Sequence, residues 1–377
     1  MTPFPDPILV TRPYLPPLAD YQKGLEEIWV GQWLTNNGPV LKRFQAELAT
    51  ALGIPATNLS LFNNGTLALE ILFHALGLAG GEVVTTPFTF VATSHALKRI
   101  GATPVFADID PETLCLSPAE AEKKITSRTK AIVPVHVYGH PCDVKGFARL
   151  GRKYGIRILY DAAHAFGVTL DGKDISAWGD ASMYSFHSTK LFHSIEGGLL
   201  AFRDPALQPK LNQLRNFAIL SDTECVDVGT NAKMNEMQAL MGELNLRVLS
   251  DLIAHRKAVY DTYAAAFEGR EDIVLLRREA MLGDLAVAHN YAYCPVLFRD
   301  FETRERVFTE LQAYNVFSRR YFYPLLTDFH PYMDARGTCP VAEDAAARVL
   351  TLPTYHGLDL GDAKKVAELV LSLLEAR

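Results

Sequence analysis

One lysine, Lys190, lies in a polar run that holds hydroxyls, two histidines, a glutamate and two glycines, YSFHSTKLFHSIEGG (residues 184–198). A lysine amine can be a solvated surface charge, a phosphate ligand, or a covalent catalyst that forms a Schiff base with an aldehyde. The run by itself leaves these three interpretations open, so the rest of the chain must decide between them.

A glycine and a threonine, Gly65 and Thr66, open the segment NNGTLALE (residues 63–70) directly after the apolar residues LSLF. Free backbone N–H groups, the positive end of a helix dipole and a hydroxyl together make an anion site. The same residues also suit an ordinary helix N-cap. The chain has neither a strand followed by GxGxxG nor a GxxxxGK[ST] motif, so a nicotinamide or P-loop nucleotide lacks its usual sequence support.

Asp161 ends an apolar run within YDAAHAFG (residues 160–167), and His164 follows three residues later. A carboxylate at such a place is costly unless a cation faces it. Capping of the next turn is the plainer alternative.

Together with Ser185, which also follows an apolar run, the residues of these segments suit a single cofactor. Pyridoxal phosphate needs an anion site for its phosphate, a carboxylate for its ring nitrogen and a lysine for its aldehyde. The combined pattern therefore favours a pyridoxal-phosphate site over a surface lysine.

The residues that position these groups alternate between short apolar runs and longer helical patterns. The expected strands are 59–63, 82–86, 103–109, 130–137 and 157–163, with helical patterns near 65–78, 91–101, 117–125 and 144–155. Such alternation predicts an α/β fold with a mainly parallel central sheet covered on both faces. Ligands bind outside the carboxyl ends of such strands, so the predicted site includes the loops at 63–66, 87–90, 161–164 and 184–190.

The second half of the chain suggests a smaller domain. Residues 234–266 form a long helical pattern, and further helices are expected near 301–314 and 362–376. We expect a large pyridoxal-phosphate-binding domain with the N-terminal segment over residues 1–250 and a small C-terminal α/β domain over 251–377.

The charge and the cysteine content of the chain argue against several classes of function. The 377 residues carry a net charge of −6 and a pI near 6.0, which argues against a general nucleic-acid or membrane-surface binder. The five cysteines show no CxxC or zinc spacing, so we expect reduced thiols and no metal. The first residues lack the pattern of a signal peptide, and no apolar run is long enough to span a membrane, so a cytoplasmic protein is expected.

Several motifs occur in an order that resembles the DegT/StrS-type sugar aminotransferases, pyridoxal-phosphate enzymes of the aspartate-aminotransferase fold (fold type I). The motifs cover nearly the whole chain: NNGTLAL, TPFTFVAT, VHVYGHPCD, YDAAHAFG, SFHSTKLFHSIEGG, GTNAKMNEMQAL and SRRYFYPL. The resemblance implies that Lys190 binds the cofactor covalently and then moves a proton. It also implies that Asp161 binds the ring nitrogen and that His164 lies near the phenolic oxygen.

The other residues implied by the resemblance hold the cofactor's phosphate and ring, or the substrate. Gly65, Thr66 and Ser185 would bind the phosphate, and Phe90 would stack on the ring. Asn231 would reach the phosphate from the partner subunit of a homodimer. Lys233, where the family more often has arginine, and Tyr321 in SRRYFYPL would contact substrate. His187 and His193 are left as orienting or substrate-contacting groups or as structural residues, and Glu196 as a residue that shapes the glycine turn.

The resemblance further implies transfer of an amino group from L-glutamate to a nucleotide-linked keto sugar. The segment around Lys190 is most similar to enzymes that aminate carbon 4. The expected product is dTDP-4-amino-4,6-dideoxy-D-glucose, made from the 4-keto-6-deoxy sugar for an O-antigen or other lipopolysaccharide. The alternatives are a GDP-perosamine-type activity and amination at carbon 3. A sugar dehydratase would replace Lys190 with histidine, and a non-catalytic sensor on the same fold would lose Lys190 or Asp161.

Overall fold

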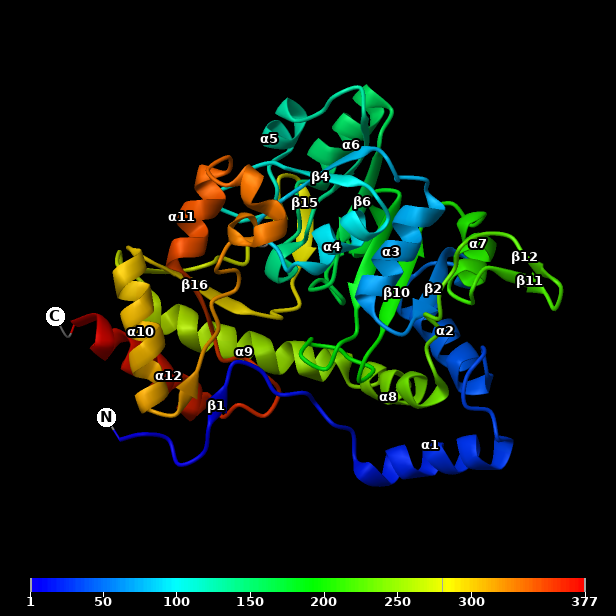
Figure 1. Cartoon of the computed structure of the whole chain (residues 1–377). Helices are drawn as coiled ribbons and strands as arrows, with labels where there is room; N and C mark the ends of the chain where they lie inside the picture. Colours follow the sequence, from blue (N-terminus) through cyan, green and yellow to red (C-terminus); the bar gives the residue numbers. More distant parts are fainter. Residues whose placement is uncertain (1, 280, 376–377) are drawn as a thin grey trace.

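The computed structural model describes residues 2–279 and 281–375, and its centre is a seven-stranded sheet (Figure 1). The strand order is β2-β10-β9-β6-β5-β3-β4, and only β10 runs antiparallel to its neighbours. The bounds of these strands are Leu59–Phe62 (β2), Glu82–Thr85 (β3), Thr103–Phe106 (β4), Thr129–Val133 (β5), Arg157–Asp161 (β6), Ala181–Ser185 (β9) and Gly198–Phe202 (β10). The expected mainly parallel sheet is confirmed, and each of the five expected strands is present.

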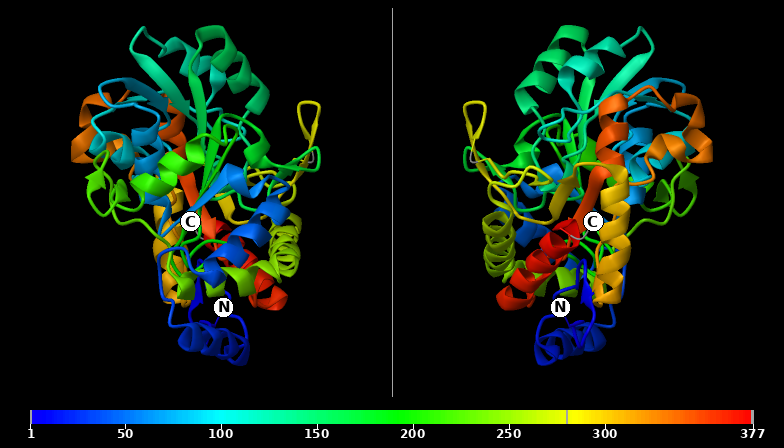
Figure 2. Two further views of the ribbon diagram at one scale, coloured as in Figure 1. Left: turned by 90° about the vertical axis from the view of Figure 1, so that its right-hand side faces the viewer. Right: turned by 90° about the vertical axis from the view of Figure 1, so that its left-hand side faces the viewer.

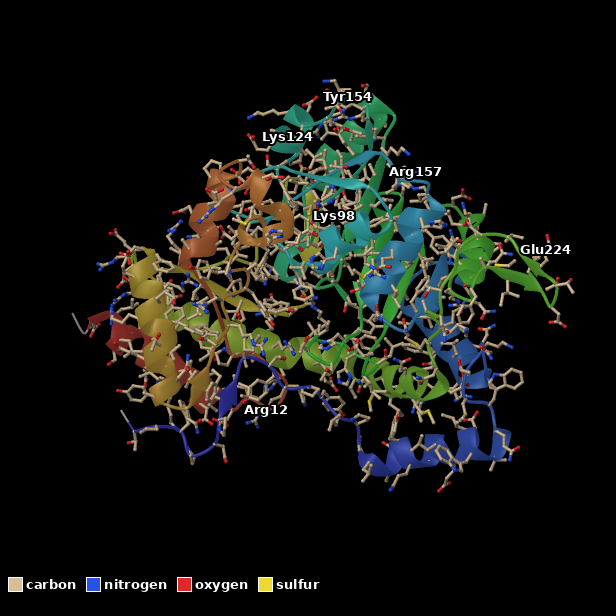
Figure 3. The ribbon with its side chains drawn as sticks, in the orientation of Figure 1. Arg12, Lys98, Lys124, Tyr154, Arg157 and Glu224 are labelled. Carbon is tan, nitrogen blue, oxygen red and sulfur yellow. The ribbon has the colours of Figure 1, made fainter. Side chains whose placement is uncertain are left out.

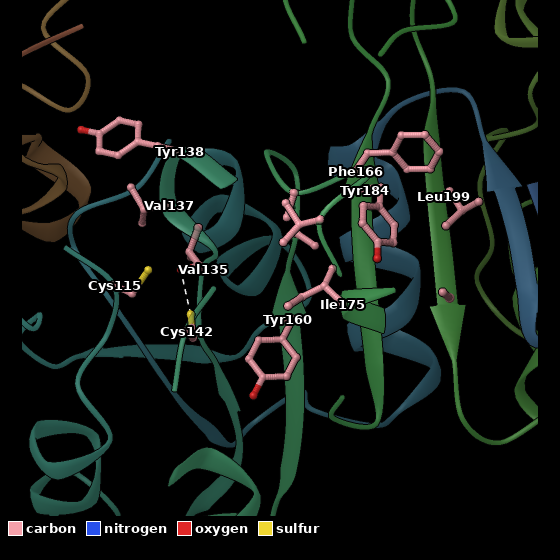
Figure 4. Packing of buried hydrophobic residues seen from close by; sticks show 14 of the residues in the cluster. Cys115, Val135, Val137, Tyr138, Cys142, Tyr160, Phe166, Ile175, Tyr184 and Leu199 are labelled. Atoms are coloured by element: carbon pink, nitrogen blue, oxygen red, sulfur yellow. Dashed lines mark hydrogen bonds between the residues drawn. The ribbon is translucent and has the colours of Figure 1, made fainter. Parts of the chain in front are cut away.

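Helices cover both faces of this sheet because alternate strand residues point to opposite sides. One face packs on α3 (Gly65–Ala75), α4 (Ala92–Arg99) and α7 (Leu207–Leu214). The other face packs on α2 (Pro39–Leu52), α5 (Pro118–Lys123), α6 (Val144–Tyr154) and α8 (Glu236–Leu246). Figure 4 shows Tyr160, Tyr184 and Leu199 projecting from neighbouring strands into this second core.

The C-terminal part of the chain forms a second, smaller layer. Its sheet has the antiparallel order β13-β16-β18, with bounds Ile273–Leu275, Cys294–Phe298 and Val349–Leu352. Four helices accompany it: α9 (Leu249–Phe267), α10 (Phe301–Ala313), α11 (Pro340–Arg348) and α12 (Leu360–Glu375). The helical pattern at 234–266 is thus divided between α8 and α9. The boundary predicted at residues 250 and 251 lies in the first turn of α9.

The N-terminal segment lies against this C-terminal layer (Figures 1 and 2). Strand β1 (Ile8–Leu9) pairs in parallel with β17 (Val316–Phe317), and the Thr354 N–H donates to the Val10 carbonyl at 3.0 Å. The next residues reach the loop of the candidate lysine, where the His193 Nε2–H donates to the Tyr14 carbonyl at 2.7 Å. Helix α1 (Leu18–Gly31) then packs on α8. The segment therefore joins the small layer to the loop that carries Lys190.

Short elements complete the fold. A four-stranded sheet of order β14-β15-β7-β8 joins the two layers, with bounds Met281–Leu282, Leu285–Ala288, Thr169–Leu170 and Lys173–Asp174. The hairpin β11 (Ile219–Ser221) and β12 (Glu224–Cys225) protrudes from the large layer, with Glu224 at its tip (Figure 3). The 3-10 turns are Ala56–Asn58, Val137–Gly139, Ile175–Ala177, Leu326–Asp328 and His330–Ala335. In the part of the chain that is described, no helix is both long and apolar enough to cross a membrane.

Gly242 allows α8 to cross α2 closely, because a Cβ there would come nearer than 3.0 Å to the ring of fully buried Phe44. We expect Gly242→Ala to overpack this crossing and lower the free energy of unfolding by about 1–3 kcal/mol. Urea denaturation followed by fluorescence measures the change. Gly31→Ala is the matched control, since its added Cβ would meet no atom within 4 Å. Equal stability of the two variants would contradict this account of the crossing.

Candidate active site

A cavity of about 730 Å³ opens where strands of the central sheet reach their carboxyl ends. Its walls come from the loops after β2, β3, β5, β6 and β9, together with residues of the C-terminal layer. Eight of the residues predicted from the sequence line this one cavity: Gly65, Thr66, Phe90, Asp161, His164, Ser185, Lys190 and Tyr321. The parallel sheet brings them together because strands that run the same way end at the same edge.

The start of α3, where an anion site is predicted, is shaped by a cap residue and a glycine. Asn64 caps the helix by accepting the Leu67 N–H at 2.8 Å, which leaves the N–H groups of the first residues directed outward. Ser185, at the end of β9, lies close to Gly65, because a Cβ on Gly65 would lie 3.3 Å from the Ser185 Cβ and 2.9 Å from the Met183 sulfur. Glycine therefore leaves the space in which an anion can approach both backbone and hydroxyl.

Asp161 lies at the end of β6 with only 4% of its surface exposed. Its carboxylate accepts the Thr93 hydroxyl at 2.7 Å and the Ala163 N–H at 3.0 Å. Among the described residues, no cationic side chain forms a salt bridge with it. Burial raises the pKa of Asp161, while these two hydrogen bonds and the charge of Lys190 oppose that rise. A cationic ring nitrogen would supply the partner that this buried carboxylate needs.

His164 lies in the turn after β6 and lines the same cavity as Asp161. Its Nδ1 accepts the Tyr138 backbone N–H at 3.1 Å, so the ring hydrogen resides on Nε2. Burial lowers the pKa of His164 well below its usual value, and the charge of Lys190 adds to that effect. The imidazole is therefore neutral at physiological pH, with one N–H to donate.

Lys190 projects into the cavity, and its Nζ lies 3.4 Å from the Tyr293 hydroxyl. Tyr293 immediately precedes β16 and also contacts the ring of His164, with centroids 4.8 Å apart. Phe90, just before α4, is 58% exposed although it is a large apolar residue. An exposed aromatic ring at a cavity wall is suited to stacking on a planar ligand.

Two predicted residues, Asn231 and Lys233, do not line this cavity. Asn231 is exposed and forms a bridge with Asn216. The Lys233 Nζ donates to the Asn216 side chain at 2.8 Å and lies 4.9 Å from the Phe217 ring centroid. Within one chain, both residues therefore belong to the surface next to the β11–β12 hairpin.

Sequence reasoning missed three cavity residues. Thr93 holds Asp161, Tyr293 approaches Lys190, and the Arg319 guanidinium donates to the Tyr321 hydroxyl at 3.3 Å. Thr93 lies in the same TFVAT motif as Phe90, so the hydroxyl one helical turn later was a usable signal. Arg319 lies two residues before Tyr321 in the SRRYFYPL motif, so it had a comparable signal. Tyr293 had none, because it lies outside the quoted motifs and comes from the C-terminal layer.

The residues present fit pyridoxal phosphate. The start of α3 offers N–H groups and a Ser185 hydroxyl to a phosphate, and buried Asp161 lacks a cationic partner among the described residues. Lys190 supplies the primary amine in the same cavity. Each of the three chemical groups of the cofactor thus meets a suitable protein group.

The raised pKa of Asp161 predicts a pH-dependent stability for the apoprotein. The folded state binds the proton more tightly than the unfolded chain, so stability falls as pH rises from the unfolded pKa through the raised folded value. We expect the Asp161→Asn apoprotein to have a higher Tm than the wild-type apoprotein at neutral pH. Thermal scans over a pH series should show this difference shrinking as wild-type Asp161 becomes protonated. A constant difference across the series would contradict the prediction.

Comparison with known proteins agrees with this site. A family model described as the DegT/DnrJ/EryC1/StrS aminotransferase family matches residues 19–371. The chain is 40% identical to a dTDP-4-amino-4,6-dideoxy-D-glucose transaminase of Shigella dysenteriae, over 93% of this chain and 95% of the relative. It is 35% identical to an Escherichia coli protein of the same name, over 97% and 98%. A crystal structure of DesI in the presence of its TDP-sugar product has a TM-score of 0.92 at 34% identity, and the match covers 100% of this chain and 95% of that chain. The chain therefore belongs to the DegT/DnrJ/EryC1/StrS family of pyridoxal-phosphate-dependent sugar aminotransferases.

Proposed function

We propose that this aminotransferase moves the amino group of L-glutamate to carbon 4 of dTDP-4-keto-6-deoxy-D-glucose, which gives dTDP-4-amino-4,6-dideoxy-D-glucose. The observation that carries the reaction type is the meeting of Lys190, Asp161 and the start of α3 in one cavity. The names of the two relatives, which both specify this dTDP sugar, support the choice of substrate.

The cofactor would be held at four points. The N–H groups of Gly65 and Thr66 and the hydroxyl of Ser185 would bind the phosphate, and Asp161 would bind the ring nitrogen. Phe90, which is exposed at the cavity wall, would cover one ring face, and His164, whose Nε2 carries the ring hydrogen, would donate to the phenolic oxygen. The Thr93 hydroxyl keeps the Asp161 carboxylate oriented toward the cavity.

When bound, pyridoxal phosphate supplies an electron sink that acidifies the carbon bearing the amino group. Lys190 would hold the cofactor through its amine, and the same amine would carry the proton. Its Nζ removes the proton from the Cα of glutamate in the first half-reaction and delivers a proton to carbon 4 of the sugar in the second. Tyr293, whose hydroxyl lies 3.4 Å from Nζ, would orient the amine.

The amino donor is a dicarboxylate, and the cavity offers one guanidinium that is not engaged in an ion pair. Arg99 pairs with Glu70 at 2.7 Å, whereas Arg319 forms no salt bridge within residues 2–279 and 281–375. Arg319 comes from the C-terminal layer and faces the same cavity as Lys190. We therefore assign the donor's carboxylate to Arg319, which suits planar two-point recognition.

A panel of acceptors tests the proposed substrate. With L-glutamate as donor, we expect wild-type enzyme to aminate the dTDP-linked 4-keto-6-deoxy sugar in preference to the UDP- and GDP-linked keto sugars. NMR should place the new amine on carbon 4. Lys190→Ala is the control without the proton carrier, and we expect no product from it. Borohydride reduction followed by peptide mapping should find the cofactor attached to Lys190 in the wild type. An amine on carbon 3, or preference for GDP, would overturn the proposed substrate.

We also propose that the site is completed by a second copy of the chain. Large apolar side chains are exposed at the end of α1 and on the hairpin segment: Trp29, Val30, Trp33, Leu34, Leu220, Val226 and Val228. Patches of this kind mark association surfaces. Asn231 is exposed directly after the hairpin segment, where it could reach the partner's phosphate site.

Mixed dimers test the shared site. Lys190→Ala and Asn231→Ala chains are each expected to have little activity, because every site in either homodimer lacks one group. Co-expression should restore activity, since each mixed dimer contains one complete site. About a quarter of the wild-type activity is expected for random two-fold assembly. Light scattering checks the dimer. A monomer, or no recovery on co-expression, would contradict the proposal.

A further inference from the structure

Glu196 lies in the wall of the cavity, yet none of the cofactor's groups requires it. It follows Lys190 in the same loop and precedes the glycine pair Gly197 and Gly198. Its side chain is 49% exposed and faces His187, with the His187 Nε2 and a Glu196 carboxylate oxygen 3.4 Å apart. The two side chains thus form a polar pair that remains open to a ligand.

The orientation of His187 is fixed by its own loop. Its Nδ1 accepts the backbone N–H of Thr189 at 3.2 Å, so the ring hydrogen resides on Nε2, the atom that faces Glu196. The Thr189 hydroxyl lies 2.7 Å from the same Nδ1. His187 can therefore donate to Glu196 while leaving the second carboxylate oxygen available to accept another hydrogen bond.

The backbone beside Glu196 is held in a strained form. Ile195 has a φ of 70°, which is unfavourable for a β-branched residue, and its side chain is 43% exposed. The Ile195 N–H donates to the His193 Nδ1 at 3.2 Å, and the Ser194 hydroxyl donates to the Glu196 carbonyl at 3.0 Å. Packing of an exposed isoleucine does not explain this conformation, whereas aiming Glu196 into the cavity does.

We propose that Glu196 is a specificity residue whose carboxylate accepts a hydrogen bond from a ring hydroxyl of the keto sugar. This inference rests on the proposed function. A carboxylate at the cavity wall repels the other ligands, because the amino donor is a dicarboxylate and the nucleotide carries a pyrophosphate. The hexose ring is neutral and offers hydroxyl donors, which a carboxylate binds more strongly than a neutral acceptor does.

The half-reaction with glutamate and the half-reaction with the keto sugar can be followed separately by the absorbance of the cofactor. Comparing their rates tests the role of Glu196 in sugar binding. In Glu196→Gln we expect the half-reaction with glutamate to keep its rate constant within about twofold. The kcat/KM for the sugar should fall about tenfold, because the amide oxygen of glutamine still accepts a hydrogen bond but lacks the charge of the carboxylate. A normal first half-reaction also shows that the variant is folded and holds its cofactor. Glu112→Gln, which changes an exposed glutamate outside the cavity, is the matched control.

Keto-sugar analogues that lack the 2-hydroxyl or the 3-hydroxyl can show which hydroxyl Glu196 binds. Removing the hydroxyl that Glu196 binds should penalise the wild type by at least about tenfold and Glu196→Gln by much less. The proposal is overturned if both half-reactions slow equally, if neither slows, or if each analogue penalises both proteins equally. The acceptor is whichever sugar of the panel the wild type aminates. A wrong nucleotide therefore overturns the proposed substrate without affecting this test.

Discussion

A buried carboxylate without a cationic partner among the described residues is the constraint on which the site depends. Asp161 ends a strand in the middle of the sheet, and burial raises its pKa. Two short hydrogen bonds, from Thr93 and from the Ala163 N–H, hold the group in place but do not neutralise it. The protein therefore keeps an electrostatic cost in its core until a cationic ring binds. A cofactor that neutralises Asp161 removes this cost, so the free energy regained on binding contributes to the affinity of the folded protein for the cofactor.

The strand order places the Asp161 carboxylate next to the other residues of the active site. β6 lies between β5 and β9, so Asp161 has the loop of Lys190 on one side and Val135 on the other. The register pairs Asp161 with Met183, two residues before Ser185. Groups separated by many residues in sequence are thereby fixed on rigid strands, where positions are more precise than on mobile loops.

The central sheet and the residues at its strand ends could be predicted from the sequence, because the carboxyl ends of parallel strands lie at the same edge of the sheet. The five apolar runs became strands, and Gly65, Asp161, Ser185 and Lys190 met in one cavity. Tyr293 could not be found in the same way, because it comes from the second layer and the docking of that layer is a long-range property. Arg319 comes from the same layer, but it lies in the SRRYFYPL motif from which Tyr321 was predicted. The antiparallel direction of β10 was also not predicted, since an apolar run does not indicate its direction. Glu196 was assigned only to a turn, because its orientation depends on the strained backbone at Ile195.

The pairing of β1 with β17 has a consequence for the order of events during synthesis. Ile8 pairs with Val316, so the first strand has no partner until more than three hundred residues have followed it. The same N-terminal segment accepts a hydrogen bond from His193, which follows Lys190 by three residues in the same loop. Contacts of such high sequence separation form late in folding. The N-terminal segment can therefore be held at both of its contacts, β17 and the lysine loop, only after the ribosome has added residue 317.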